Sequence, residues 1–239
     1  MGTCVRLFRR LRGGIWLAVG LAATACPVSA RSPVVVELFT SQGCASCVKA
    51  GELVAELAAR PRIIALTFDV DYWDYLGWQD TFARSEFADR QRAYLKPLGV
   101  HDVYTPEVVV NGRRETPAVD PQAVDKLIQD AQHGVQDPPQ IIVRKKTLAV
   151  GAGPAPKGGG EVWLIRYDPR EQSVAVKKGE TRGAVVVERN VVRELIRLGA
   201  WRGRPKTFRL PETEDASLTS VALVQGAHGG AIIAARKLQ

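Results

Sequence analysis

Residues 34–47 read VVVELFTSQGCASC, and this stretch decides the fold. Its first six residues are rich in β-branched and apolar side chains, which is typical of a strand buried on both faces of a sheet. A short polar turn follows. From Cys44 to Arg60 the apolar residues recur at helical spacing and Pro61 ends the pattern, so the sequence predicts a helix over this segment.

The cysteine pair Cys44-Ala45-Ser46-Cys47 stands at the expected start of that helix, directly after the strand. A Cys-x-x-Cys in this position is the thioredoxin-like arrangement. Free N–H groups and the helix dipole at a helix start favour negative charge, so we expect Cys44 to be the exposed, acidic and attacking thiol. Cys47, one turn further on, is placed to resolve a mixed disulfide.

Other interpretations of the cysteine pair stay open at this point. A purely structural disulfide is disfavoured, because closing so short a loop removes little entropy from the unfolded chain. A zinc site would need two further ligands, and the three histidines, His101, His133 and His228, do not form a recognisable ligand motif. Two thiolates can bind Cu(I). We expect no resident metal and no cofactor besides the Cys44–Cys47 disulfide.

Composition narrows the class of protein. The chain has 239 residues, of which 46% are hydrophobic and 24% charged, as in soluble globular proteins. No apolar run reaches the roughly 18–20 residues of a membrane-spanning helix, which excludes a polytopic membrane protein. The net charge is +8, but four of the 33 basic residues lie in residues 1–30; the 29 that remain face 25 acidic residues, a net charge of +4. Charge therefore gives little support to nucleic-acid binding.

Residues 1–30 have the pattern of a signal peptide. A basic stretch at 6–12 precedes an apolar run at 15–25, and small residues follow it. An N-terminal anchoring helix and a lipid anchor are alternatives. Cleavage would remove Cys4 and Cys26, leaving only the Cys-x-x-Cys pair. We expect a periplasmic or secreted protein without an integral membrane span after signal removal.

The remaining sequence divides at Asp137-Pro138-Pro139. We expect a thioredoxin-like α/β domain over residues 33–137 and a small all-β, sandwich-like domain over 138–239, because short strand patterns alternate with turns beyond the boundary. Residues 190–198 fit a helix or a strand equally well. The other expected elements are strands at 63–68 and 107–110, a hairpin turn at Asn111-Gly112, helices beginning near Ser85 and at Asp120-Pro121, and strands at 141–150, 162–167, 173–176, 184–187, 207–210, 218–225 and 231–235.

Two sequence features lie near the expected cysteine site. Glu37 alternates with Val35 and Phe39 in the first strand; a carboxyl beneath the cysteine helix would have a raised pKa and accept the proton of Cys47. A salt bridge to Lys49 or Arg62 is the equally weighted alternative.

Thr105-Pro106 directly precedes the strand at 107–110. In a thioredoxin-like fold this bond is a candidate for a cis peptide, which would place the Thr105 backbone beside the cysteines as a docking edge for a peptide. A proline that simply opens an edge strand is the alternative interpretation.

An aromatic segment lies between the second strand and the following helix. It reads Asp71-Tyr72-Trp73-Asp74-Tyr75-Leu76-Gly77-Trp78. Tyr72, Trp73 and Trp78 are candidates to line a substrate groove, although packing in the core is the favoured interpretation.

Taken together, these residues resemble a bacterial family of secreted proteins of unassigned function with a thioredoxin-like domain, the domain of unknown function 1223 family. The resemblance covers most of the mature chain and implies the fold and export, but no substrate. Val48-Lys49-Ala50-Gly51 departs from the family's Pro-Pro-Ala-Asp, and Asp69 stands in place of His. The matching motifs are Val36 to Cys44 with Ser46-Cys47, Val70 to Asp74 with Leu76-Gly77-Trp78, Val103 to Pro106, and Asn190-Val191-Val192 through Leu198-Gly199.

The functional hypothesis is an exported thiol–disulfide oxidoreductase in which Cys44 attacks and Cys47 resolves. Its partners would be a protein or a small thiol or disulfide as substrate, and a redox partner protein. A non-catalytic binding or scaffold module of the cell envelope and a Cu(I)-handling protein are the alternatives.

Overall fold

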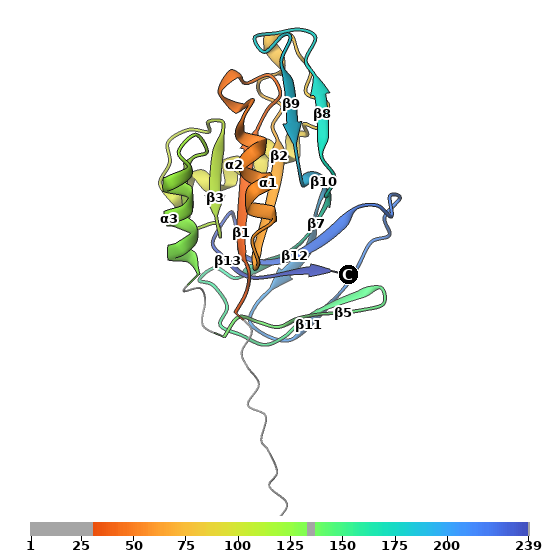
Figure 1. Ribbon diagram of the computed structural model, residues 1–239. Coiled ribbons are helices and arrows are strands. Elements are labelled where there is room, and N and C mark those ends of the chain that lie inside the picture. Colours follow the sequence, from red (N-terminus) through yellow and green to blue (C-terminus); the bar gives the residue numbers. More distant parts are fainter. Residues whose placement is uncertain (1–30, 133–136, 239) are drawn as a thin grey trace, which may run out of the picture.

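The computed structural model describes residues 31–132 and 137–238, so the expected signal segment lies outside the described residues (Figure 1). The chain is mostly β, with one mixed eight-stranded sheet and few helices. Its N-terminal half contains β1 (Val34–Thr40), the 3₁₀ helix η1 (Ala45–Cys47), α1 (Ala50–Ala58), β2 (Ile63–Asp69), the 3₁₀ helix η2 (Asp74–Leu76), α2 (Ser85–Leu98), β3 (Glu107–Val110), β4 (Arg114–Pro117) and α3 (Pro121–Ala131).

Within residues 137–238 every regular element is a strand. The segment with ambiguous periodicity forms the long strand β10, and the continuous run expected at 141–150 is a hairpin of two strands that turns at Lys145, whose φ is 52°. The strands of this half are β5 (Ile141–Arg144), β6 (Thr147–Val150), β7 (Gly160–Asp168), β8 (Gln172–Ala175), β9 (Val185–Glu188), β10 (Val191–Trp201), β11 (Lys206–Arg209), β12 (Thr219–Gly226) and β13 (Ile232–Leu238).

The eight-stranded sheet joins the two halves. Its order is β13-β12-β7-β10-β2-β1-β3-β4, with β2 parallel to both β1 and β10 and the other neighbours antiparallel. Strands from both sides of residue 137 therefore share one sheet. The division into two domains at that residue stays a prediction.

The helices cover both faces of β1 and β2, which is why every residue of these two strands is buried. On one face α1 and α3 pack against Val34, Val36 and Leu38. On the other face α2 packs against Val35 and Phe39, in a core that also contains residues of β7, β10 and β12. The face that each strand residue occupies decides which helix it can reach.

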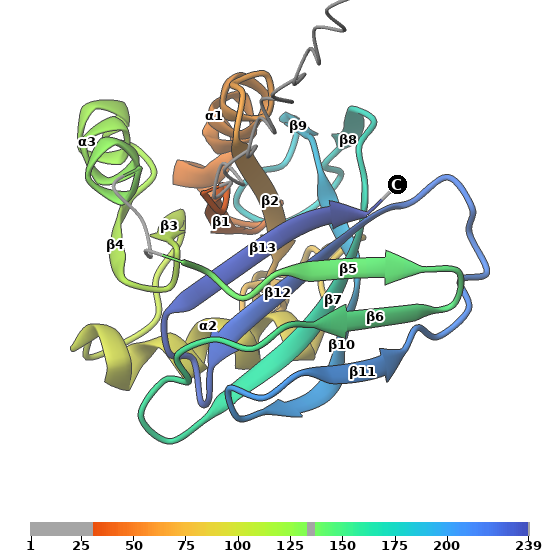
Figure 2. The same cartoon turned by 90° about the horizontal axis from the view of Figure 1, so that it is seen from below.

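Two smaller sheets complete the fold. The three-stranded sheet β11-β6-β5 lies over β12 and β13 and shares with them a core that includes Trp201 and Phe208 (Figure 2). The hairpin β8–β9 stands apart at the other end of the molecule, next to α1 (Figure 1). This end also carries the cysteine turn.

Candidate functional site

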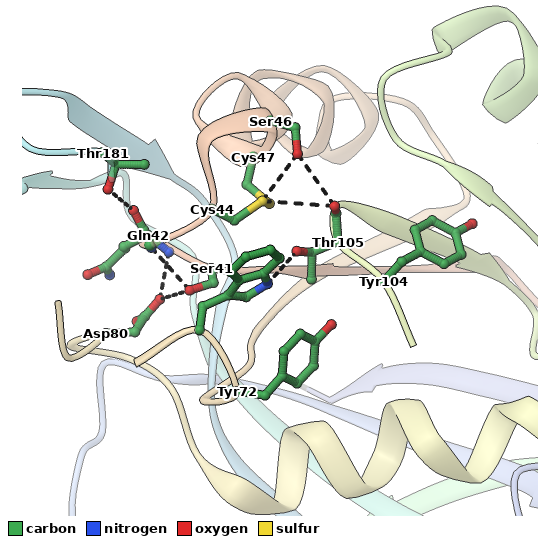
Figure 3. The surroundings of a disulfide bond; sticks show 12 residues. Ser41, Gln42, Cys44, Ser46, Cys47, Tyr72, Asp80, Tyr104, Thr105 and Thr181 are labelled. Atoms are coloured by element: carbon green, nitrogen blue, oxygen red, sulfur yellow. Dashed lines mark hydrogen bonds between the residues drawn. A yellow bond between two sulfur atoms is a disulfide. The ribbon is translucent and has the colours of Figure 1, made fainter. Parts of the chain in front are cut away.

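The cysteine pair lies in the turn between β1 and α1. Cys44 and Cys47 are joined by a disulfide, their Cα atoms are 5.2 Å apart, and the N–H of Cys47 donates to the carbonyl oxygen of Cys44 at 3.0 Å (Figure 3). The expected α-helix from Cys44 is wrong in its start: residues 45–47 form a 3₁₀ turn and α1 begins only at Ala50. A 3₁₀ turn ahead of an α-helix is common. The N–H groups nearest the sulfurs thus belong to the 3₁₀ turn.

Both sulfur-bearing residues are almost fully buried. Cys44 is 2% exposed and Cys47 is 1% exposed. In the disulfide form the two cysteines thus differ little in exposure, and the expectation that Cys44 is the more exposed and more acidic thiol of the reduced protein stays a prediction. Ser46, between them, is exposed.

The Thr105–Pro106 peptide bond is cis, as the sequence predicts, and it brings the loop before β3 against the disulfide. Cys44 Sγ lies 3.9 Å from the carbonyl oxygen of Thr105. The Ser46 hydroxyl lies 3.3 Å from Cys44 Sγ and 3.5 Å from the same carbonyl oxygen (Figure 3). The Cys44 sulfur, the Ser46 hydroxyl and the Thr105 carbonyl therefore lie together, and Ser46 is the exposed residue among them. Sequence reasoning did not single out Ser46, although its place inside the Cys-x-x-Cys was a usable signal.

Trp73 supports the loop that carries Thr105. Its Nε1–H donates to the Thr105 hydroxyl at 2.7 Å, and its ring is only partly buried. The neighbouring Tyr72 donates its hydroxyl to Gln91 of α2 at 3.1 Å. Both rings pack against the core on the α2 side of the sheet. Trp73 thus lies at the site and fixes Thr105, whereas Tyr72 fastens the aromatic segment to the core.

Gln91 also holds the other side of the Thr105 loop. Its Nε2 donates to the carbonyl oxygen of Tyr104 at 2.8 Å and to the Glu107 carboxylate at 2.6 Å. Burial raises the pKa of Glu107 to about 7, since the charged form loses its hydration. The loop is therefore anchored at Tyr104, Thr105 and Glu107 by side chains from two different elements.

Trp78 supports the turn that leads into Cys44. Its Nε1–H donates to Gln42 Oε1 at 3.1 Å, and Gln42 is fully buried. The Gln42 N–H donates to the Asp80 carboxylate at 2.7 Å, while its carbonyl oxygen accepts from the Thr181 hydroxyl at 2.7 Å. Trp78 therefore supports the turn that leads into Cys44, and its expected role in lining a substrate groove stays a prediction. Gln42, Asp80 and Thr181 were not among the expected site residues.

The expected position of Glu37 is wrong. Its side chain points to the face covered by α2, whereas α1 and the cysteine turn belong to the other face. Arg90 of α2 donates from Nε to the Glu37 carboxylate at 2.6 Å, and the Tyr94 hydroxyl donates to its second oxygen. Neither Lys49 nor Arg62, the partners considered from sequence, forms this ion pair. Glu37 is part of a buried structural network, so its expected role as proton acceptor for Cys47 has no geometric basis.

A family model of proteins of unknown function, DUF1223, matches residues 35–225. The chain belongs to this family. The matched region of this DUF1223 protein includes the cysteine turn, the Thr105 loop and the aromatic segment.

Solved structures agree with this assignment. A crystal structure of a protein from Agrobacterium tumefaciens has 33% sequence identity and a TM-score of 0.69, over 86% of this chain and 93% of that chain. HBP35 of Porphyromonas gingivalis has 16% identity and a TM-score of 0.56, over 87% of this chain and 75% of that one. At 16% identity the second likeness concerns the fold alone. No curated protein matches the DUF1223 chain.

Membrane-spanning helices and clusters of metal-binding side chains are both absent from the described residues of this DUF1223 protein. No helix within them has the length and apolar character to cross a membrane. Within the same ranges, no group of three or more His, Cys, Asp or Glu side chains is arranged to bind a metal ion. His101 is exposed and lies three residues before Tyr104.

Proposed function

We propose that this protein is an exported thiol–disulfide oxidoreductase that uses the Cys44–Cys47 pair. The observation that carries the proposal is the meeting of Cys44 Sγ, the Ser46 hydroxyl and the Thr105 carbonyl oxygen beside a cis peptide bond. The Thr105 carbonyl oxygen is a backbone hydrogen-bond acceptor next to Cys44 Sγ. A polypeptide substrate in extended conformation can bind there.

A thioredoxin-like arrangement of the N-terminal half is part of the proposal. In its support, β1 and β2 are parallel and joined through α1, β3 adds antiparallel to β1, β4 adds antiparallel to β3, and α3 follows. The sandwich-like interpretation of the C-terminal half rests on the core that β5, β6 and β11 share with β7, β12 and β13.

The proposed reaction transfers two electrons between the cysteine pair and a substrate. The Cys44 thiolate attacks one sulfur of a substrate disulfide, forming a mixed disulfide and releasing one substrate thiolate, which takes up a proton. Cys47 then loses its proton and attacks Cys44 Sγ. The Cys44–Cys47 disulfide forms and the second substrate thiolate leaves. The reverse sequence oxidises a substrate dithiol, and a redox partner protein restores the starting state.

Export of the chain would be compatible with disulfide chemistry. Residues 1–30 would direct the chain to the periplasm or outside the cell, where disulfides persist. Removal of that segment would leave two cysteines, so the pair would have no competing thiol in its own chain.

Trapping a mixed disulfide between Cys44 and a substrate tests the proposed oxidoreductase activity. Cys47→Ala, reduced and mixed with hydroxyethyl disulfide or an oxidised peptide, is expected to form a stable mixed disulfide at Cys44, because no resolving thiol remains. Intact-mass and peptide mapping detect the adduct. Cys44→Ala is the matched control and should react at least about tenfold more slowly. Failure of Cys47→Ala to form an adduct with every disulfide tried would reject the proposal.

A non-catalytic binding module is the second candidate, and one observation favours it. The two cysteines are 2% and 1% exposed, so an attacking sulfur reaches them only if the turn or the Thr105 loop moves. A negative trapping experiment with a folded, reduced protein would support this candidate.

The Ser46 hydroxyl gives a second test of the proposed chemistry. Its oxygen lies 3.3 Å from Cys44 Sγ, and a hydroxyl that donates to a thiolate stabilises the charged form of the thiol. In the reduced protein, Ser46→Ala is expected to shift the alkylation of Cys44 to higher pH, because the thiolate loses a hydrogen-bond donor. The pH dependence of the iodoacetamide alkylation rate measures this. Ser46→Thr keeps a hydroxyl and should retain the original pH dependence; an equal shift in both variants would contradict the assigned role.

A further inference from the structure

Two buried carboxyl groups that are not part of the Cys44–Cys47 site face each other. Asp69 ends β2 and Glu188 ends β9, and they are 0% and 2% exposed. None of their four carboxyl oxygens accepts a hydrogen bond from an N–H or O–H of the described chain. Their carboxyl groups nevertheless lie close enough to hydrogen-bond to each other if one carries a proton, and the Gln42 side chain lies close enough to Glu188 to favour its charged form. Buried polar groups without partners are exceptions that need an explanation.

The pair lies on the α1 face of the sheet. Asp69 alternates with Ile63 and Ala65, which pack in the α1 core, and it stands opposite Thr40 at the end of β1. The strand that carries Glu188 rests directly on α1, because a Cβ atom on Gly51 would lie 1.9 Å from the carbonyl oxygen of Val187. The two acids therefore join β9 to the end of β2 beside the start of α1.

The charges around the pair do not neutralise it. Asp80 repels both carboxylates, and Arg193, whose guanidinium stacks on the Phe82 ring at 4.0 Å, attracts them more weakly. Near Gly51, the charged residues are exposed: Lys49, which precedes α1, and Glu52 in its first turn. Next to Glu188, Arg189 pairs with Glu171 on the surface.

Burial, followed by mutual repulsion in the case of Asp69, raises the pKa of both acids above its ordinary value. A folded state with one proton on the pair is therefore preferred over a fully ionised pair near neutral pH. Two like charges at one buried site cannot both be ionised without cost.

We propose that Asp69 and Glu188 share one proton and act as a proton-dependent latch that holds the β8–β9 hairpin against α1 and β2. With the proton present, one carboxyl group donates an O–H···O bond to the other. When hydroxide or a base removes the proton, two buried negative charges remain and β9 moves away from β2. Neutral bonds from Asn190 to Ala65 and from Thr67 to Arg189 stay intact, so the hairpin loosens without detaching.

The latch matters because the hairpin also supports the cysteine turn. Its tip donates from the Thr181 hydroxyl to the carbonyl oxygen of Gln42 (Figure 3). Gly179, also at the tip, packs on Trp78. Loosening the hairpin at high pH would release this support from the segment that leads into Cys44. The inference goes beyond the proposed function and holds whether or not the cysteines react.

Hydrogen exchange measured by mass spectrometry on the oxidised full-length protein tests the latch. Protection factors, corrected for the intrinsic pH dependence, are compared between about pH 5 and about pH 9, a range that spans ordinary and raised carboxyl pKa values. Protection of the β8–β9 amides is expected to fall by about tenfold or more, because an opening linked to one proton changes tenfold per pH unit in the linked range. Amides of the distant β5–β6 hairpin should not change.

The variants separate the latch from general pH effects. Asp69→Asn and Glu188→Gln each replace one acid by an amide that donates to the remaining carboxylate at every pH, so protection of the hairpin should become independent of pH. Glu107→Gln removes another buried acid with a raised pKa and should leave the hairpin's response as in the wild type. Constant protection in the wild-type protein would overturn the latch, as would an unchanged pH response in both amide variants.

Discussion

Replacing Arg90 by methionine is expected to destabilise the protein by about 3–5 kcal/mol, because the Glu37 carboxylate then stays buried without its cation. Arg90 and Glu37 side chains are 4% and 0% exposed and 2.6 Å apart. The guanidinium also donates to the Tyr94 hydroxyl at 3.0 Å and to Gln225 at 3.3 Å. It lies 5.7 Å from the ring centre of Trp163. Urea denaturation at neutral pH measures the loss.

Two further variants show whether the unpaired charge is the cause. Arg92→Met, on the exposed side of the same helix, removes only a surface pair with Asp89 and should change stability by less than about 0.5 kcal/mol. The double variant Glu37→Leu with Arg90→Met should recover most of the loss, since apolar residues often replace buried ion pairs without cost. A loss below about 1 kcal/mol for Arg90→Met alone would contradict this account of the network.

Helices and strands whose signals lie within a few neighbouring residues were predicted well from the sequence. The strand at 107–110 has the expected bounds, and α3 begins after Asp120, whose carboxylate accepts from the N–H of Ala123 at 3.0 Å. On α3, Val124 and Ile128 are buried, as the periodicity indicates. Turn residues, helix caps and amphipathic spacing depend only on residues that are close in the sequence. They can therefore be recognised in a single sequence.

Long-range pairing could not be predicted in this way. Residues 190–198 were ambiguous between helix and strand, and they became β10, which pairs with β7 and β2. No short-range pattern shows that β10 continues the sheet from β2, because that pairing joins residues more than a hundred positions apart. The expected boundary at Asp137 followed from local composition alone.

The candidate site shows the same limit at the level of single residues. The cis bond at Thr105–Pro106 and the closeness of Thr105 to Cys44 followed from the motif and its place before a strand. For Glu37, alternation gave the neighbours on its own face, Val35 and Phe39, but not the helix that covers that face. Alternation along a strand shows which residues share a face of the sheet. Which helix covers that face depends on the path of the chain, which alternation does not show.

Replacing Gly51 by alanine is expected to destabilise the protein by about 1–3 kcal/mol, although alanine is the better helix former. The new Cβ would lie 1.9 Å from the Val187 carbonyl oxygen and 3.0 Å from its carbonyl carbon. Both are backbone atoms, so no rotamer change relieves the contact and either α1 or β9 must shift. Urea denaturation of the oxidised protein measures the change in the free energy of unfolding.

Glu52→Ala provides the matched control for Gly51→Ala. It places the same residue one position further along α1, on the exposed side, and should change stability by less than about 0.5 kcal/mol. Hydrogen exchange should locate the damage of Gly51→Ala in α1 and the β8–β9 hairpin, and leave the β5–β6 hairpin unchanged. If Gly51→Ala instead stabilises the protein, helix propensity outweighs the clash, and the close approach of β9 to α1 on which the latch depends is wrong.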